Sequence, residues 1–277
     1  HISSLMAQNN VRMEELRGIG MGIPSPVKYQ EGYANHPAFM PGWHLLDLKK
    51  FFAEKYNCPA FIDNEVNTMA LAEFIQRPDR NHHILLCLKA GTGIGAGLVI
   101  DGEIYRGENG GGNNVGHIQI SGSTALCKCG KIGCIEATAS APAVRQKATE
   151  YAKANPGTEL WKIFSEEGSI SLSAIKKAAD NGDKGALGII KDAGEALGEL
   201  AGTLTMILDP AEIVVSGQMM QLGPNYLYYI RAKAERISAP WAGYEQNIRF
   251  SSMPSSSGAV GAARLCINEL FDHNLIL

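Results

Sequence analysis

The chain has 277 residues, which is enough for one large domain or two ordinary ones. Hydrophobic residues make up 45% of it and charged residues 19%, values typical of globular proteins. The net charge is −3 and Lys and Arg form no block, so the sequence excludes nucleic-acid binding by this chain alone. Its apolar runs are too short to span a bilayer and no secretory signal is visible, so we expect no membrane partner.

Cysteine usage and the first residue add two expectations. Cys58, Cys87 and Cys266 are scattered in apolar surroundings and are interpreted as small buried side chains. This pattern is typical of a reducing compartment rather than of a disulfide framework, so we expect a cytoplasmic protein. The chain begins with His1 rather than Met, from which we expect that further sequence precedes it.

The hydrophobic periodicity of the first third of the chain predicts alternating helices and strands. Residues 64–75 are expected to form a helix that opens with capping residue types at Asp63 and Asn64. The other elements predicted here are a helix end at 3–11, a strand running into a Gly/Pro turn at 16–27, a helix at 41–57 and a short buried strand at 58–63.

The rest of the chain continues this alternation. Residues 82–107 are predicted to form two strands joined by a glycine-rich turn. Helices are expected at 141–155, 171–182, 183–208, 225–237 and 258–271, and strands at 211–217 and 247–252. Strands and helices intermix in βα order, so the predicted fold class is α/β.

One short segment, "GHIQISGSTALCKCGKIGC", holds a histidine and three of the six cysteines. Zinc is bound by four tetrahedral N/S ligands, and structural sites close all four positions with protein groups. His117, Cys127, Cys129 and Cys134 would form such a set, so we expect a structural Zn2+ with no open position for catalysis. The alternatives are reduced cysteines in a polar loop or a disulfide, which the odd thiol and the short Cys127–Cys129 spacing disfavour.

This segment, extended to Glu136, closely resembles the zinc motif of the ROK family, which groups bacterial sugar kinases with sugar-responsive transcriptional repressors. Further segments resemble the family in the same order: "GIGMGIPSPV" its Gly-rich strand and turn, "GWHLLDLKKFF" its Gly-Trp segment, "IDNEVNTMALAE" the segment with the kinases' catalytic Asn-Asp pair, "KAGTGIGAGLVIDGEIYRG" its phosphate loop, and "LDPAEIVVSG" the strand near the adenine pocket. The resemblance covers nearly the whole chain.

The resemblance implies the actin-like sugar-kinase fold, in which two α/β domains surround a central ligand cleft that holds the sugar. The first domain would comprise residues 1–80 plus 258–277, incomplete at its start, and the second residues 81–257 with the zinc loop. The family also implies that this loop positions Glu136 to bind sugar hydroxyls. Homodimers or tetramers are expected.

The first departure from the kinase pattern is the pair Asn64 and Glu65. In ROK kinases this pair is Asn-Asp, and its Asp is the general base for the attacking hydroxyl. Asn-Glu resembles the xylose-repressor branch instead, and the extra methylene moves the carboxylate by more than catalytic geometry usually tolerates. Equally, Glu65 could be an acidic residue in a first helical turn and Asn64 a helix cap.

The second departure is Asn114, which stands where the family usually has a sugar-binding Glu. Asn both donates and accepts hydrogen bonds, so we expect sugar binding with an altered preference. In the family the following histidine, His117 here, serves both the metal and a sugar hydroxyl through its two ring nitrogens. A role as metal ligand alone is the equal alternative.

The nucleotide motifs are thinner than those of ROK kinases. Gly91, Thr92 and Gly93 could form a nest of backbone N–H groups for phosphates, although a glycine-rich turn between strands needs no ligand. Gly217 is kept near the expected adenine pocket without the kinases' richer Gly run, and the family's Asp-x-Gly-x-Thr phosphate motif is not found. Phosphoryl transfer depends on positioning Mg-ATP, so we expect a poor kinase.

Three hypotheses follow, in order of preference. The first is the sugar-binding effector domain of a ROK transcriptional repressor, which would bind DNA only through an upstream winged helix-turn-helix domain outside this chain. The second is an ATP- and Mg2+-dependent sugar kinase with Glu65 as its base. The third is a zinc-stabilised relic that binds neither ligand well.

Overall fold

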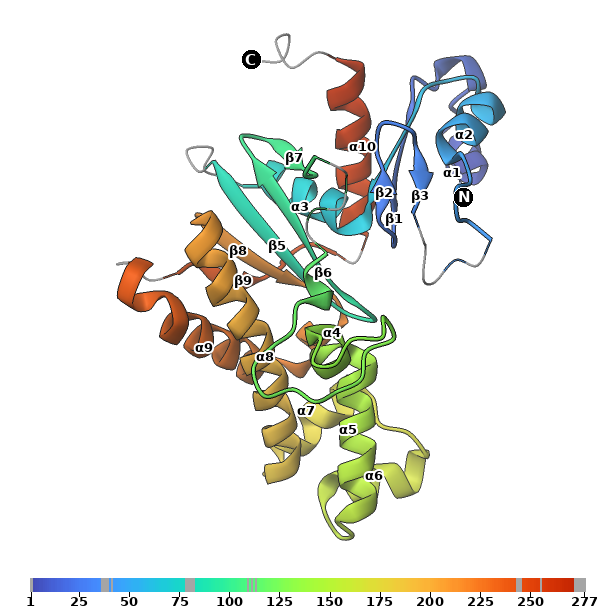
Figure 1. Cartoon of the computed structure of the whole chain (residues 1–277). Helices are drawn as coiled ribbons and strands as arrows, with labels where there is room; N and C mark the ends of the chain where they lie inside the picture. The colour runs from blue at the N-terminus through green and yellow to red at the C-terminus, as the bar shows by residue number, and fades with distance from the viewer. Residues whose placement is uncertain are drawn as a thin grey trace. The chain divides into compact units, whose positions relative to one another are not determined.

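The computed structural model describes residues 2–35, 40, 42–77, 83–108, 110, 112, 114–242, 246–254 and 256–271 (Figure 1). The chain divides into two compact units, each with strands and helices. The first unit comprises His1–Asn81, Gly97–Asn113 and Met253–Leu277, and the second His82–Ala96 and Asn114–Ser252. This division differs from the expected boundaries, 1–80 plus 258–277 and 81–257, mainly at residues 97–113, which group with the first unit.

The central strand pair of the first unit brings Asn64 to a strand end. β1 (Ile19–Ile23) pairs in parallel with β4 (Ala60–Asn64), so that Ile23 lies opposite Asn64 at the carboxyl end of both strands. A small antiparallel hairpin, β2 (Val27–Lys28) and β3 (Tyr33–Ala34), follows β1. Ligand-binding side chains commonly follow the carboxyl ends of parallel strands.

A second hairpin explains why residues 97–113 join the first unit. β6 (Ile94–Ile100) begins in the second unit, and its first-unit part pairs antiparallel with β7 (Glu103–Tyr105). Asp101 and Gly102 between them both have positive φ, which matches a tight type I′ turn. Gly97 lies directly against the backbone carbonyl of Val66, which leaves no room for a side chain.

The helices of the first unit are α1 (Ile2–Gln8), α2 (Leu48–Tyr56), α3 (Glu65–Ile75) and α10 (Ser257–Leu270). α2 begins later than the predicted residue 41 because the Asp47 carboxylate accepts the Lys50 N–H at 2.8 Å and caps the helix there. α10 packs against α3 and β1 at backbone contact distance, with Gly261 on the Thr68 carbonyl.

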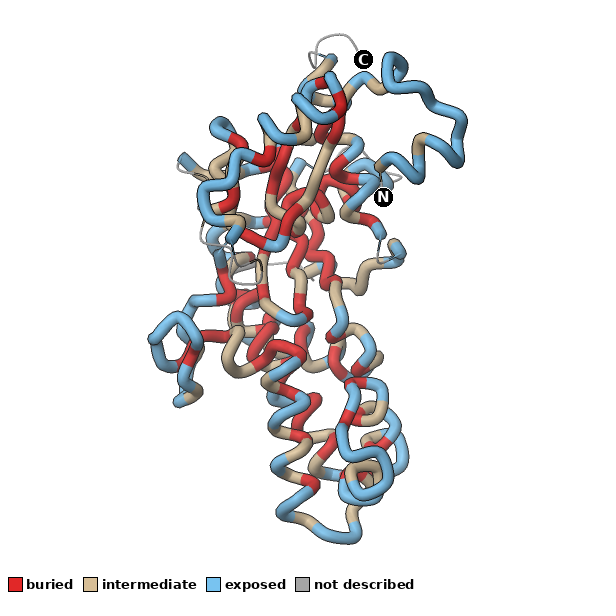
Figure 2. Tube along the Cα trace, turned by 90° about the vertical axis from the view of Figure 1, so that its right-hand side faces the viewer, coloured by how far each residue is buried: buried red, intermediate tan, exposed pale blue. Residues whose placement is uncertain are grey.

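Three strands of the second unit pair in parallel in one sheet. β8 (Glu212–Ser216) pairs on one side with β5 (Ile84–Ala90) and on the other with β9 (Ile248–Phe250). Every residue of β8 is buried. Figure 2 marks the buried residues of the chain in red. Parallel strands covered on both faces have continuous apolar sequences, which is why these strands could be predicted.

Six helices of the described part complete the second unit: α4 (Ile135–Ala139), α5 (Ala141–Ala154), α6 (Glu159–Glu167), α7 (Leu172–Asp180), α8 (Lys184–Leu208) and α9 (Pro224–Ala242). The short helices α4 and α6 were not expected from the sequence. Side-chain caps start three of the six helices: Thr158 caps α6, Ser171 caps α7 and Asp183 caps α8.

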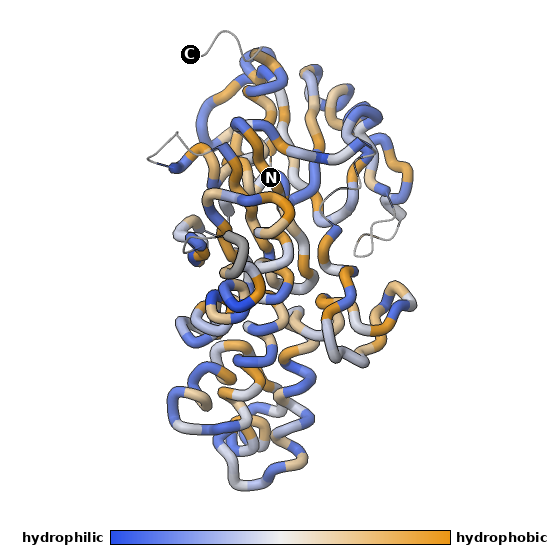
Figure 3. Tube along the Cα trace, turned by 60° about the vertical axis from the view of Figure 1, so that its left-hand side comes forward, coloured by the Kyte–Doolittle hydropathy of each residue, from blue (hydrophilic) through white to orange (hydrophobic). Residues whose placement is uncertain are grey.

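Hydrophobic and hydrophilic residues are interleaved along the trace (Figure 3). In α7, for example, Leu172, Ile175 and Ala178 are buried at helical spacing. In the described part of the chain, no helix combines the length and the hydropathy that crossing a membrane requires.

Candidate functional site

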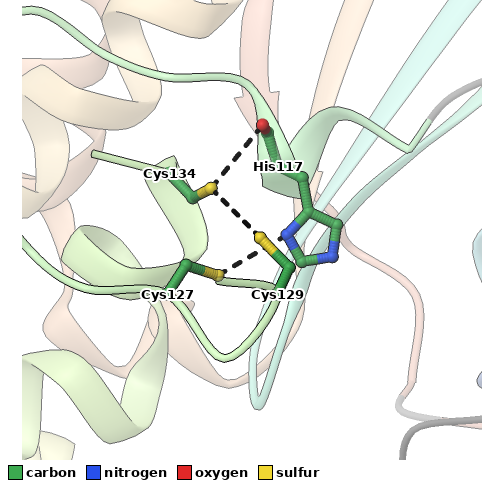
Figure 4. A group of neighbouring side chains, drawn as sticks. All are labelled: His117, Cys127, Cys129 and Cys134. Atoms are coloured by element: carbon green, nitrogen blue, oxygen red, sulfur yellow. Dashed lines mark hydrogen bonds between the residues drawn. The ribbon is translucent and has the colours of Figure 1, made fainter. Parts of the chain in front are cut away.

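Three thiols and one imidazole converge in the second unit (Figure 4). The ligand atoms of His117, Cys127, Cys129 and Cys134 all lie within 4.8 Å of one another. Cys127 Sγ is 3.6 Å from His117 Nδ1, and Cys129 Sγ is 3.6 Å from Cys134 Sγ. Sulfur ligands on a tetrahedral zinc, at about 2.3 Å from the metal, are about 3.8 Å apart. The donor set and its spacing therefore fit a closed Zn2+ site.

Two glycines and local backbone hydrogen bonds shape the loop that carries these thiols. The Cys127 N–H donates to the Lys131 carbonyl at 2.8 Å, and the Gly130 N–H donates back to Cys127 at 2.9 Å. Gly130 and Gly133 have φ of 88° and 83°, which glycine adopts without strain. A side chain at Gly133 would also lie 2.9 Å from the Ser123 carbonyl. The loop therefore depends on glycine as well as on thiols.

The thiols differ in acidity. Burial first, and then the neighbouring thiols of Cys129 and Cys127, together raise the pKa of Cys134 to about 12. The hydrogen bond from the Lys131 backbone lowers the pKa of the exposed Cys129 thiol. The Lys131 ammonium also donates to the His117 carbonyl at 3.0 Å. A bound cation would ionise all three thiols, because metal coordination requires thiolates.

The loop leads directly into Glu136. α4 starts immediately after Cys134, which places Glu136 in its first turn. Glu136 Oε2 accepts the Ile94 N–H at 3.0 Å, and a side chain at Gly93 would lie 2.7 Å from the same oxygen. Among the described residues, Oε1 has no hydrogen-bond partner. One carboxylate oxygen is therefore used by the fold, and the other is left for a ligand.

The glycine-rich turn lies beside Gly217 within the second unit. The Ala141 N–H donates to the Gly91 carbonyl at 2.8 Å, which ties the turn to the start of α5. Gln218 Nε2 lies 3.5 Å from Thr92 Oγ1 on the other side. Gly217 has a φ of 96° and lies against the end of β5, so only glycine fits there. Gly91, Thr92, Gly93 and Gly217 are thus brought together.

Asn64 caps α3. Its Oδ1 accepts the Val66 N–H at 2.8 Å, and its Nδ2 donates to the Ser25 carbonyl at 2.9 Å. Glu65 follows as the first residue of the helix, half-buried. The capping role considered from the sequence is therefore present, and one N–H and one Oδ1 lone pair of the Asn64 amide are left for a ligand.

Substitution of Asn64 should separate capping from ligand binding. Asn64→Ala removes the acceptor for the Val66 N–H and is expected to lower the free energy of unfolding by about 1 kcal/mol. Asn64→Asp keeps a capping oxygen and should lower the free energy of unfolding less than Asn64→Ala does. Urea denaturation of both variants measures the difference, and equal loss in both would contradict capping as the main role.

An ion pair that the sequence did not reveal lies one residue before Asn64. Asp63 is buried, and its Oδ2 accepts Arg106 Nε at 2.7 Å. The Arg106 guanidinium stacks on the Tyr29 ring, and the Tyr29 hydroxyl donates to Glu269. Burial and this acceptor raise the pKa of Tyr29 well above its usual value. No motif links these four residues in sequence.

Asn114 directly precedes a single 3-10 turn, Val115–His117, and His117 is the last residue of that turn. Both side chains are exposed. His117 Nδ1 faces the thiols, and Nε2 points away from them in Figure 4. The histidine therefore has one nitrogen in the cluster and one outside it.

A family model, the ROK family, matches residues 1–269. The chain belongs to the ROK family. It is 30% identical to the glucokinase of Halalkalibacterium halodurans over 252 residues, which are 91% of this chain and 76% of that enzyme. It is 28% identical to the xylose repressor of Bacillus spizizenii over 257 residues, 93% of this chain and 62% of the repressor. A ROK family glucokinase from Streptomyces griseus, solved with glucose and AMPPNP, superposes with a TM-score of 0.78 at 25% identity, over 96% of this chain and 87% of that one.

ROK membership confirms the predicted fold class, the actin-like sugar-kinase fold. The ROK relatives include enzymes and repressors at similar identity, so membership alone supports sugar binding and does not choose between them. The chain spans about three fifths of the xylose repressor and about three quarters of the glucokinase.

Proposed function

We propose that this chain is the effector domain of a ROK-family transcriptional regulator that senses a monosaccharide or a derivative of one. The pair Asn64–Glu65 carries this proposal, because ROK kinases have Asn-Asp at this place. Glu65 starts α3 directly after a capped strand end, where an extra methylene displaces the carboxylate from the position of an Asp base. The chain therefore keeps hydrogen-bonding groups for a sugar without the kinase's base geometry.

The proposed sugar ligands are the side chains of Asn64, Glu65, Asn114, His117 and Glu136. The outward Nε2 of His117 and the unpartnered Oε1 of Glu136 support this role. A Zn2+ held by the His117 cluster is part of the proposal, as a structural ion that orders the loop before Glu136.

DNA binding is assigned to a domain outside this chain. The chain spans 62% of the xylose repressor of Bacillus spizizenii, which leaves room in such a protein for a separate DNA-binding domain. In a homodimer or tetramer, the sugar would favour one of two arrangements of the effector domains and so change the affinity for an operator.

A sugar kinase is the second candidate. It is favoured by the glycine-rich turn at Gly91–Gly93, which lies beside Gly217, and by the identity to a glucokinase. Under this alternative the turn would bind ATP phosphates with Mg2+, and Glu65 would act as the base.

One experiment separates the two. The protein is tested against pentoses, hexoses and N-acetylated hexoses, by melting shift and by ADP release with Mg-ATP. We expect a melting shift with one class of sugar and no ADP release. Glu136→Gln should weaken the binding of that sugar about tenfold, because it removes a charged acceptor. Glu150→Gln, on the exposed face of α5, is the matched control and should leave the affinity for the sugar unchanged.

Turnover of any sugar at a rate typical of kinases would contradict the regulator. The absence of both turnover and a melting shift would contradict both candidates.

A further inference from the structure

The buried carboxylate of Asp63 organises the turn into α3. Its side chain is 3% exposed. Oδ1 accepts the Asn64 N–H at 2.6 Å and Asn67 Nδ2 at 2.8 Å. Oδ2 accepts Arg106 Nε at 2.7 Å. One carboxylate therefore joins the end of β4 to the first turn of α3, and Arg106 is the cation that compensates its charge.

Arg106 contacts the Asp63 carboxylate on one side and the Tyr29 ring on the other. Its guanidinium carbon lies 3.6 Å from the centroid of the Tyr29 ring, a close face-on contact. The Tyr29 hydroxyl donates to Glu269 near the end of α10. The Arg106 side chain is 23% exposed, so solvent screens this arrangement only in part. All four residues belong to the first unit, which makes the network independent of how the units are arranged.

Loss of the Arg106 cation would disturb the turn into α3 more than the loss of a surface ion pair would. An uncompensated carboxylate is unfavourable in a buried position, so it would rotate toward water or take up a proton. In both cases it would weaken its bond to the Asn64 N–H, the residue whose side chain caps α3. The side chains of Asn64 and Glu65 would then leave their positions, and binding constellations tolerate only about 0.5 Å of displacement.

We propose that Arg106 is a positioning residue, which fixes the Asn64–Glu65 turn through Asp63 and thereby sets the affinity for the sugar without contacting it. This inference rests on the proposed function for its ligand. It names a residue that neither the zinc motif nor the Asn64–Glu65 pair includes.

The test compares Arg106→Met and Arg106→Lys with a matched control. The control is Arg249→Met in the second unit. Arg249 Nε lies 2.6 Å from Glu212 Oε1 at the start of β8, and the Glu212 side chain is 9% exposed. This substitution therefore breaks an ion pair whose burial is similar to that of Asp63 and Arg106. The sugar that gives the largest melting shift is titrated against each variant. Arg106→Met should raise its Kd about tenfold or more, and Arg106→Lys about threefold, since Lys keeps the charge without the planar fork. Arg249→Met should leave the Kd within about twofold.

Amide hydrogen exchange without sugar gives the second readout. The amides of Asn64 and Val66 should exchange about tenfold faster in Arg106→Met and at the wild-type rate in Arg249→Met. If no sugar binds the wild type, the proposed function fails, and exchange still decides the role of Arg106. If Arg106→Met does not fold, Arg106→Lys carries both measurements. Exchange and Kd that match the Arg249→Met control would overturn the inference.

Discussion

A zinc chelator is expected to remove about one Zn2+ per chain and to lower the melting temperature by several degrees. The four ligand atoms lie within 4.8 Å of one another, so without an ion three thiols and an imidazole would have to share this space. A ligand present at a thousand times its Kd stabilises the folded state by about 4 kcal/mol, and structural zinc often exceeds that ratio. Because the thiols must ionise, metal affinity should rise with pH.

Cys134→Ser is the sharpest variant for this prediction. Cys134 is fully buried and belongs to the cluster, so its loss should abolish metal retention and the effect of the chelator on melting. Cys87→Ser is the control, since Cys87 is equally buried in β5 outside the cluster and should retain the metal. Metal content by elemental analysis checks both. Equal zinc in the two variants would contradict the site, and zinc in neither the wild type nor Cys87→Ser would contradict the choice of metal.

The loop also links metal loss to ligand binding. α4 begins immediately after Cys134, so an untethered loop would no longer hold Glu136 near the Ile94 N–H. The melting shift with sugar should therefore disappear in Cys134→Ser and persist in Cys87→Ser.

Local chemistry explains why much of the fold could be predicted from the sequence. The parallel strands β5 and β8 are continuous apolar runs, and α3 starts where a capping residue precedes an apolar helix. The four atoms of the cluster come from residues only 17 positions apart at most, and Cys and His have few other reasons to recur at that spacing. Such signals lie within one segment of the sequence.

The features that could not be predicted depend on distant segments. Asp63 and Arg106 are 43 residues apart, and Tyr29 and Glu269 are 240 apart. Each of these residue types is ordinary in its own segment. Only the packing of β4, the β2–β3 hairpin, the end of β7 and α10 brings them together. The use of Glu136 Oε2 by the Ile94 backbone is similar, because the sequence names the carboxylate but not which oxygen remains free.

Gly261→Ala is expected to destabilise the protein by about 3 kcal/mol or more, the second large effect. α10 crosses α3 so closely at this point that a new Cβ would overlap the Thr68 carbonyl, and the amide nitrogen of Ala72 would lie 3.1 Å from it. These neighbours are backbone atoms of a helix and cannot rotate away as a side chain would. The substitution must therefore push α10 off α3.

The control substitutions are expected to change the free energy of unfolding in the opposite direction to Gly261→Ala. Alanine is favoured over glycine inside a helix by about 1 kcal/mol, so a helical glycine with open space should gain stability on substitution. Gly188 in α8 has nothing within 4 Å of its missing Cβ, and Gly258 in α10 has only ordinary contacts at 3.6 Å. Gly188→Ala and Gly258→Ala should thus raise the free energy of unfolding or leave it unchanged in urea denaturation. A Gly261→Ala variant as stable as these two would mean that α10 does not lie on α3 as described. A large loss confined to Gly261→Ala would place the last helix in backbone contact with the helix that Asn64 caps.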